Sequence, residues 1–144
     1  MYCFRGGLRS QLVQQWLREV GIEVPRIQGG WKAMRRALCR EVDAAAERPM
    51  LVVAGLTGCA KTELIQRLAT GLDLEACARH KGSAFGRHPL QAPAQIDFEH
   101  AMGRRILELP PACVVEDESR QIGRINIPLT FWRGMEQALS LIHI

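Results

Sequence analysis

The spacing of apolar residues over the first third of the chain predicts two helices joined by a short extended segment. Over residues 10–20 the apolar positions fall on one helical face, and Gly21 follows as a helix stop. Residues 22–27 (IEVPRI) are a short apolar run that predicts a strand, and Pro25 places it at a sheet edge or a strand end. After a Gly-Gly turn, residues 31–46 predict the second helix.

A different pattern begins at residue 50 and predicts a strand–turn–helix unit. Residues 50–55 (MLVVAG) form a continuous apolar run, as expected of a strand buried on both faces, and residues 62–70 predict the helix that follows. Residues 71–93 are rich in glycine and proline and predict a loop or lid. Residues 95–109 predict an amphipathic helix, and residues 112–119 (ACVVEDES) predict a second buried strand that runs into acidic residues.

The change of pattern places a domain boundary between residues 46 and 47, so residues 1–46 and 47–144 are expected to belong to two α/β domains. With 47% hydrophobic and 24% charged residues, the 144-residue chain has a globular rather than a disordered composition. The net charge is +4 and the isoelectric point about 9.0. This mild basic excess fits a polyanionic partner such as RNA but does not by itself identify one.

Five cysteines are present, no pair of them has C-x-x-C spacing, and the four histidines are not at zinc-ligand spacing from any cysteine. We therefore expect reduced thiols in a cytoplasmic protein. No apolar run reaches the roughly 20 residues that a membrane helix requires, so no membrane partner is expected.

The first ten residues (MYCFRGGLRS) form a candidate anion-binding loop around a cysteine. Gly6 and Gly7 are able to adopt positive φ, which lets successive backbone N–H groups turn inward, and a predicted helix follows at once. Arg5 and Arg9 add full positive charges. Together these features favour the thiolate of Cys3, the reactive form of the side chain, which predicts a catalytic cysteine that carries a sulfur or selenium atom or attacks a phosphate.

Residues 55–62 (GLTGCAKT) lie between a predicted strand and a predicted helix, which is the context of a Walker A loop. Backbone amides near Gly55 and Gly58 would hold phosphate, Lys61 would pair with its charge, and Thr62 would ligate Mg²⁺. Ala60 stands where the general pattern has glycine. This departure weakens the prediction of nucleotide hydrolysis more than that of phosphate binding.

The acids after the second predicted strand are candidates for the carboxylate that holds Mg²⁺ in such a site. Glu116, Asp117 and Glu118 follow one another there, and the sequence alone does not select among them, so Glu116 and Asp117 are taken as tentative metal ligands together with Thr62. The basic residues Arg79, His80, Lys81 and Arg87 flank a G-S-A-F-G turn, where they would touch substrate phosphates or RNA, or form a solvated loop. Phe85, inside that turn, would stack on a base or a prenyl chain, or anchor the loop.

The order of these motifs resembles the tRNA 2-selenouridine synthase family. The resemblance is carried by Y-C-F-R-G-G-L-R-S, P-R-I-x-G-G-W-K-A-M-R, G-L-T-G-x-x-K-T-E-L-I, H-K-G-S-A-F-G, Q-x-D-F-E and V-V-E-D-E-S-R-x-I-G. It implies that residues 1–46 are the C-terminal remnant of a rhodanese-like domain, with its catalytic cysteine at Cys3. Residues 47–144 would then be the N-terminal part of a P-loop parallel α/β domain. We expect a fragment that is inactive alone, because two or three strands do not complete such a sheet.

The resemblance also implies a reaction, in which selenium replaces the sulfur of 2-thiouridine at the wobble position of tRNA. Selenophosphate and geranyl diphosphate would be substrates, the latter for S-geranylation of the thiouridine, and Mg²⁺ would assist. Whether a nucleotide binds stays open. Two other interpretations remain: a rhodanese-type sulfurtransferase or C-x5-R phosphatase fused to a P-loop domain, and an inactive fragment that binds a nucleotide or RNA.

Overall fold

A computed structural model describes residues 1–56, 58–80 and 93–142, and it divides the chain into two compact units, Met1–Cys39 and Arg40–Ile144. The division falls inside the second helix rather than after it. Val42 and Ala45, near the end of that helix, are buried in the core of the second unit, which explains why the last turns belong there.

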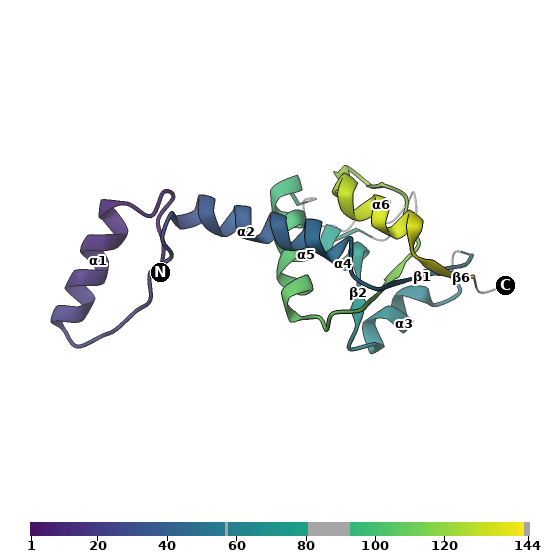
Figure 1. Ribbon diagram of the computed structural model, residues 1–144, viewed down its shortest axis with the longest axis horizontal. Helices are drawn as coiled ribbons and strands as arrows, with labels where there is room; N and C mark the ends of the chain where they lie inside the picture. The colour runs from purple at the N-terminus through teal and green to yellow at the C-terminus, as the bar shows by residue number, and fades with distance from the viewer. Residues whose placement is uncertain (57, 81–92, 143–144) are drawn as a thin grey trace. The chain divides into compact units, whose positions relative to one another are not determined.

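The first unit contains helix α1 (Leu8–Glu19) and the beginning of α2 (Gly30–Ala45), both predicted by periodicity (Figure 1). Gly21 has a φ of +78° and follows the C-cap of α1, as expected of a glycine helix stop. The strand predicted at residues 22–27 is wrong, because this segment has no regular secondary structure. Pro25 has no N–H group to donate to a neighbouring strand. Its carbonyl accepts a hydrogen bond from the terminal amine of Met1 at 2.6 Å.

The first unit has almost no apolar core of its own. Leu38 is the one buried hydrophobic side chain among residues 1–39, all of which the structure describes. The apolar face of α1 is exposed instead: Trp16 retains 60% and Val20 70% of its accessible surface. The helical periodicity at residues 10–20 therefore predicted the helix but not a burial partner for it.

The second unit is built on a four-stranded parallel sheet of order β2–β3–β1–β6. The central strands are β1 (Met50–Ala54) and β3 (Cys113–Glu116), both predicted as buried strands. The outer strands are β2 (Gly71–Leu72) and β6 (Leu139–Ile142). The sheet thus has more strands than the two or three expected.

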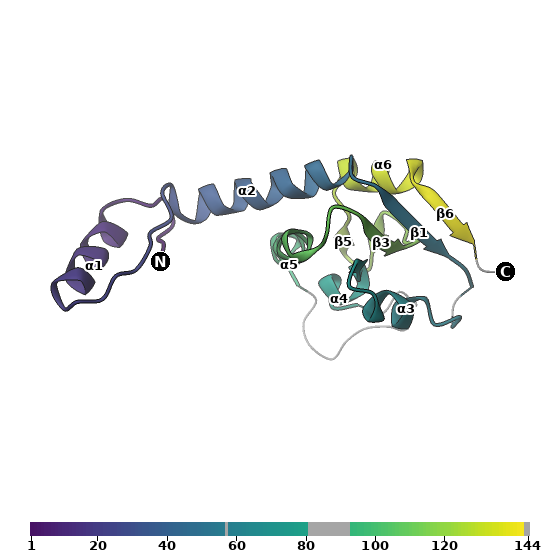
Figure 2. The ribbon, with the colours of Figure 1, turned by 60° about the horizontal axis from the view of Figure 1, so that its bottom comes forward.

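Four helices and a small hairpin surround this sheet in the described part of the second unit. The helices are α3 (Lys61–Arg67), α4 (Leu74–Ala78), α5 (Gln95–Glu108) and α6 (Leu129–Gln137), and the hairpin pairs β4 (Gln121–Ile122) with β5 (Ile125–Asn126). Figures 1 and 2 show α6 and α3 on opposite sides of β1. The prediction of a loop or lid at residues 71–93 is partly wrong, because β2 and α4 occupy its first part.

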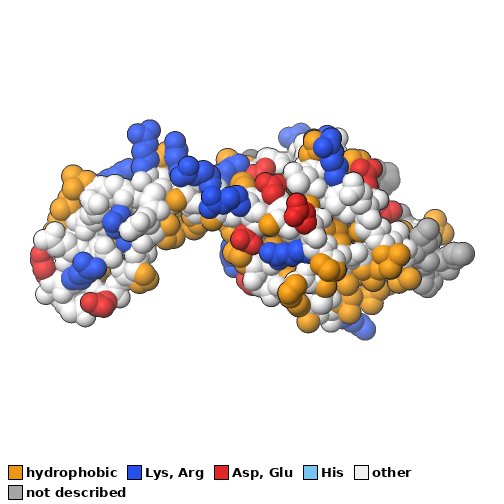
Figure 3. Space-filling model, in the orientation of Figure 1, with side chains coloured by type: hydrophobic (Ala, Val, Ile, Leu, Met, Phe, Trp, Pro, Cys, Tyr) orange, Lys and Arg blue, Asp and Glu red, His pale blue; other side chains and the backbone are white. Residues whose placement is uncertain are grey.

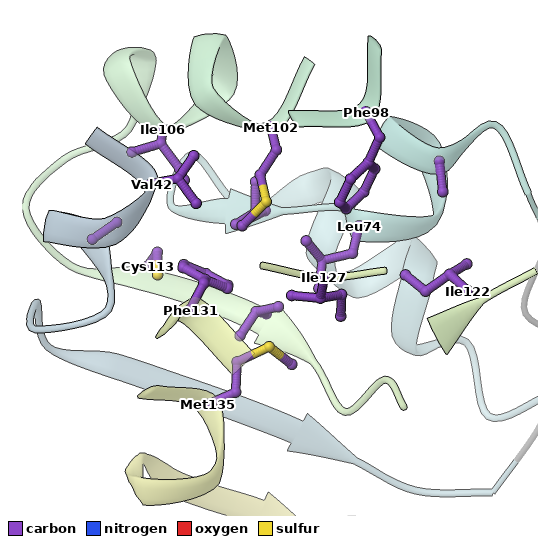
Figure 4. Close-up of a cluster of buried hydrophobic side chains, with 14 of the residues drawn as sticks. Val42, Leu74, Phe98, Met102, Ile106, Cys113, Ile122, Ile127, Phe131 and Met135 are labelled. Carbon is purple, nitrogen blue, oxygen red and sulfur yellow. The ribbon is translucent and has the colours of Figure 1, made fainter. Parts of the chain in front are cut away.

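The core of the second unit lies between the sheet and the helices α2, α5 and α6 (Figure 4). Phe98 and Met102 reach it from α5, and Phe131 from α6, each with no exposed surface. Val42 joins them from the last turns of α2. The predicted α/β class with a parallel sheet is confirmed for this unit. No helix among the described residues is long and apolar enough to cross a membrane.

Candidate functional site: a cysteine loop and a phosphate loop

The backbone around Cys3 forms a tight loop that leads directly into α1. Gly6 takes the left-handed conformation predicted for it, with a φ of +68°, and its N–H donates to the Cys3 carbonyl at 3.4 Å. Gly7 behaves differently, because its φ is −88° and it serves as the N-cap of α1. Only one of the two glycines therefore needs its special freedom.

The sulfur of Cys3 contacts a serine in the first turn of α1. Cys3 Sγ lies 3.3 Å from Ser10 Oγ, and Ser10 Oγ donates to the Gly7 carbonyl at 3.0 Å. The pKa of Cys3 is lowered from 9.0 to about 7, chiefly by the hydrogen bond from the Ser10 side chain. Burial is the next largest effect and opposes the lowering, while hydrogen bonds from the backbone N–H groups of Ser10, Arg5 and Gly7 lower the pKa further. The loop thus favours the thiolate chiefly through the Ser10 hydroxyl, a group that the prediction from the glycines, the arginines and the helix start did not include.

Ser10 is the residue that sequence reasoning missed in this loop. Ser10 ends the C-F-R-G-G-L-R-S motif, but the motif alone does not indicate that its hydroxyl contacts the sulfur. Its side chain is 4% exposed, and it is the one buried polar residue among residues 1–39. The available signal was its position in the first turn of a helix that starts at the loop, where side chains point back toward the helix N-terminus.

The cysteine loop is fastened to the first turn of α2. The N–H of Trp31 donates to the Cys3 carbonyl at 3.0 Å, and the N–H of Lys32 donates to the Phe4 carbonyl at 3.3 Å. These bonds satisfy N–H groups that a helix start would otherwise leave without partners. Gly30 makes the contact possible, because a Cβ at its position would overlap the Cys3 carbonyl.

Arginines surround the loop in two different ways. Arg26 Nη1 donates to the Gly6 carbonyl at 2.7 Å, so this arginine shapes the loop, although no sequence motif pointed to it. Arg5 and Arg9, predicted to line the anion cradle, are exposed and make no side-chain hydrogen bond or ion pair with another described residue. Arg5 does contribute a backbone N–H to the sulfur.

The phosphate loop connects β1 to α3, as predicted. Gly55 follows the carboxyl end of β1, and Gly58 has a φ of +87°. Ala60, the residue that departs from the general pattern, has a φ of +62° and is the N-cap of α3. A left-handed conformation costs a residue with a Cβ about 1–2 kcal/mol, so the loop holds Ala60 in a strained backbone that glycine would relieve.

Lys61 and Thr62 both lie at the start of α3, but they face different partners. Lys61 Nζ donates to the carbonyls of Gly55 at 2.8 Å and Leu56 at 3.0 Å, so its charge is folded back over the loop. Thr62 Oγ1 donates to a carboxylate oxygen of Glu116 at 3.0 Å. Lys61 thus lies over the loop where a phosphate would bind, and Thr62 lies beside a carboxylate that would share its metal.

The register of the sheet decides which acid reaches Thr62. Val53 at the end of β1 is paired with Glu116 at the end of β3, so Glu116 lies directly beside the phosphate loop. Glu116 is 1% exposed, whereas Asp117 is exposed and donates its backbone N–H to the Val53 carbonyl at 2.9 Å. Of the two tentative metal ligands, the structure brings Glu116 to Thr62 and leaves Asp117 at the surface.

Glu75 on α4 completes this acidic group and was not selected from the sequence. Its carboxylate lies 3.5 Å from Thr62 Oγ1. Burial raises the pKa of Glu116 to about 7, and the negative charge of Glu75 contributes to the rise. Burial, followed by the charge of Glu75, also raises the pKa of Glu118. The sequence signal that could have located Glu75 is Asp73, the N-cap of α4. The Asp73 side chain accepts from the N–H of Ala76 at 2.7 Å, which starts the helix that carries Glu75.

The donor set beside the phosphate loop suits Mg²⁺, which binds proteins through one or two carboxylates and completes its shell with water and substrate phosphate. Glu116 has one buried carboxylate oxygen, Oε1, with no hydrogen-bond partner. Among the described residues no three His, Cys, Asp or Glu side chains come together as a metal-binding cluster.

The basic segment at 79–87 is described only at its start. Arg79 is exposed and caps the end of α4, and the His80 ring lies against Gly123. Lys81, Phe85 and Arg87, for which both substrate contact and a purely structural loop were expected alternatives, lie outside the described residues.

A family profile described as the tRNA 2-selenouridine synthase AAA domain matches residues 48–143, which include the phosphate loop and Glu116. The chain belongs to the tRNA 2-selenouridine synthase family. The predicted resemblance to this family is thereby confirmed. No solved structure matches the chain.

Three relatives named tRNA 2-selenouridine synthase illustrate the similarity. A protein of Chromohalobacter salexigens is 68% identical over 138 residues, which cover 96% of this chain and 38% of the relative. Proteins of Serratia proteamaculans and Shewanella piezotolerans are 50% and 48% identical, each over 96% of this chain and 38% and 39% of their own lengths. The chain therefore spans about two-fifths of the length of the curated relatives it matches.

Proposed function

We propose that this chain is the part of a cytoplasmic tRNA 2-selenouridine synthase that carries a chalcogen-handling cysteine and a diphosphate-binding loop. The enzyme would replace the sulfur of wobble 2-thiouridine with selenium from selenophosphate, after S-geranylation by geranyl diphosphate. The observation that carries the proposal is the presence in one chain of a thiolate-favouring loop at Cys3 and a strand–loop–helix phosphate site at residues 55–62, in a member of this family.

The Cys3 loop has the properties needed to handle a selenium or sulfur atom. A pKa of about 7 makes roughly half of the thiol a thiolate near neutral pH, where it is nucleophilic. The inward N–H groups of Arg5, Gly7 and Ser10 would stabilise a negatively charged terminal selenium or sulfur as well as the thiolate. The same loop supports a rhodanese-like origin of this unit.

The phosphate loop has the properties needed to bind the diphosphate of the geranyl donor. Lys61 would exchange the carbonyls of Gly55 and Leu56 for a phosphate oxygen, since an anion offers it full negative charge. Thr62 and Glu116 would hold Mg²⁺, which as a Lewis acid neutralises charge on a diphosphate leaving group. Because Ala60 stands in a left-handed conformation where the general nucleotide-binding pattern has glycine, a diphosphate is the better supported ligand.

The test is a chimera of the relative with 68% identity, in which the matching segment is replaced by this chain. It would be incubated with 2-thiouridine tRNA, geranyl diphosphate and selenophosphate, and the nucleosides analysed by mass spectrometry. We expect selenouridine from the chimera, and none from this chain alone. Cys3→Ser should abolish selenation and retain diphosphate binding, whereas Lys61→Ala should lose diphosphate binding and retain Cys3 reactivity.

A folded chimera that converts no thiouridine would overturn the proposal. Release of phosphate from an aryl phosphate by this chain would then favour the C-x5-R phosphatase, and thiocyanate formation from thiosulfate would favour the sulfurtransferase. Retention of full selenation by Cys3→Ser would show that another residue carries the selenium.

A further inference from the structure

The positive charge of the chain is concentrated in its first unit. Residues 1–39 contain seven arginines and lysines against two glutamates, a net charge of +5. Residues 40–144 contain twelve basic and thirteen acidic residues, a net charge of −1. The net charge of +4 is therefore not a mild excess spread over the surface, but a strong excess in the unit that carries Cys3.

Four of these cations lie at the surface around the cysteine loop. Arg5 belongs to the loop, Arg9 to the first turn of α1, and Lys32 to the first turn of α2, which is bonded to the loop through the Lys32 N–H. Arg36 follows Lys32 by four residues and so lies on the same face of α2. Figure 3 shows Lys and Arg side chains gathered over the first half of α2.

These four cations have no carboxylate partners among the described residues. Exposed cations that are not paired within a protein retain their full charge for a polyanion, because no competing carboxylate has to be displaced. The nearest acids of this unit in the sequence, Glu19 and Glu23, lie at and beyond the far end of α1 from the loop. The patch of Arg5, Arg9, Lys32 and Arg36 is therefore uniformly positive.

Exposed aromatic rings accompany this patch. Tyr2 and Phe4 flank Cys3 in the chain and retain 52% and 51% of their accessible surface. Tyr2 stacks on Trp31, with ring centroids 6.4 Å apart, and Lys32 Nζ lies 5.4 Å from the centre of the Phe4 ring. Rings beside a cationic groove stack on unpaired bases, which a duplex does not offer.

We propose that Arg5, Arg9, Lys32 and Arg36 form the surface that binds the RNA backbone, and that Phe4 stacks on an unpaired base beside Cys3. The partner is a single-stranded loop of RNA rather than a duplex. This inference rests on the proposed function, because it names where that enzyme would hold its RNA. It also selects the cysteine loop, rather than the phosphate loop, as the RNA-facing part of the chain.

An acidic membrane surface is the rival partner, because the apolar face of α1 is exposed. The location of the charge argues against it. The cations lie on the cysteine loop, the first turn of α1 and α2, whereas the later turns of α1 carry only Arg18 and Glu19 as charged residues. An interfacial helix has its basic residues along its own polar face.

The test measures binding of this chain to a fluorescent RNA hairpin with an unpaired loop over a range of salt concentrations. The variant Lys32→Gln/Arg36→Gln removes two cations of the patch. Its matched control is Arg104→Gln/Arg133→Gln, which removes two exposed arginines from α5 and α6. We expect the patch variant to bind about tenfold more weakly at low salt, and the salt slope to shrink by about 0.7 for each lost contact, while the control is unchanged.

Two further measurements complete the test. Phe4→Leu should weaken binding to the hairpin and leave the weaker binding to a fully paired duplex of equal length unchanged. Equal effects of the patch variant and its control would overturn the proposal, as would preference for the duplex or for anionic lipid vesicles. Hairpin binding through the patch without selenouridine formation by the chimera would preserve this surface and refute the proposed reaction, so the two failures are distinguishable.

Discussion

At Cys3, one hydroxyl group serves both the sulfur and the loop carbonyl. In the thiol form, Cys3 donates to Ser10 Oγ and Ser10 donates to the Gly7 carbonyl. Once the thiol ionises, the Ser10 hydroxyl is able to turn its proton toward the sulfur, because a thiolate is the stronger acceptor. The buried position of Ser10 keeps water from competing for either bond.

Removal of this hydroxyl should make Cys3 less reactive at neutral pH. The pKa of Cys3 is lowered to about 7, so the thiolate predominates above that pH and is lost below it. Ser10→Ala should move the midpoint of Cys3 alkylation toward the ordinary value of 9.0, since Ser10 supplies the largest contribution. Iodoacetamide labelling at several pH values, resolved by peptide mass spectrometry, measures the midpoint.

Cys77 and the exposed Ser140 supply the controls for that experiment. Burial raises the pKa of Cys77 to about 11, so its peptide should stay unlabelled at pH 7–8 in every variant. Ser140→Ala on β6 should leave the Cys3 midpoint in place. An unchanged midpoint in Ser10→Ala would contradict the role assigned to the hydroxyl.

Individual residues were predictable from sequence where a motif assigns them a fixed place. Gly6, Lys61 and Thr62 lie at the turns and helix start that their motifs require. Glu75 and Arg26 were not predictable in this way, because their partners lie 13 and 20 residues away and depend on how α4 and the cysteine loop fold back. Ala60 shows where a motif stops being informative about the backbone, because an alanine in the sequence does not indicate a positive φ.

At the scale of elements, the contact between the cysteine loop and α2 depends on a missing side chain. Gly30→Ala should disrupt the loop, because its Cβ would overlap the Cys3 carbonyl and the Gly6 N–H, and because its φ of +60° disfavours a Cβ. The expected result is a Cys3 alkylation midpoint shifted toward 9.0, with the backbone N–H groups displaced.

Gly7→Ala is the matched control for this substitution. Its φ is −88° and nothing lies within 4 Å of the added Cβ, so Cys3 should keep its reactivity. Equal loss of reactivity in both variants would indicate that the loop needs general flexibility rather than the close approach at Gly30.

Long elements were predictable from their pattern and short ones were not. Helices α1, α2 and α5 have 12, 16 and 14 residues, enough for a helical period to repeat. Strand β2 has 2 residues and α4 has 5, too few for any period, and the glycine and proline content of residues 71–93 suggested a loop. The predicted strand at 22–27 was wrong because an apolar run with a proline becomes a strand only where a partner pairs with it.

At the scale of the whole molecule, the two units differ in how they are stabilised. Phe131→Ala should destabilise the second unit by about 3–5 kcal/mol, because the ring is fully buried in its core. Hydrogen exchange of peptides covering residues 50–54 measures the free energy of opening of this unit. Leu129→Ala, at an exposed position of the same helix, should change it little.

Helix α1 of the first unit should show little protection from hydrogen exchange. The amides of α1 should exchange quickly even in the unaltered chain, since its apolar face is exposed. Protection of α1 equal to that of β1 would contradict this description. Sequence periodicity alone does not make this distinction, because it predicts an apolar face without predicting what covers it.

The strand order of the sheet also affects how fast the second unit folds. Strand β1 pairs with residues 63 positions later at β3 and 88 positions later at β6. Such distant pairings are slow to form, because the intervening chain must be brought together first. The phosphate loop takes its shape at the end of β1, so it becomes a binding site only when folding is nearly complete. If the loop binds a diphosphate as proposed, we expect the ligand to prolong the lifetime of the folded unit without shortening the time needed to reach it.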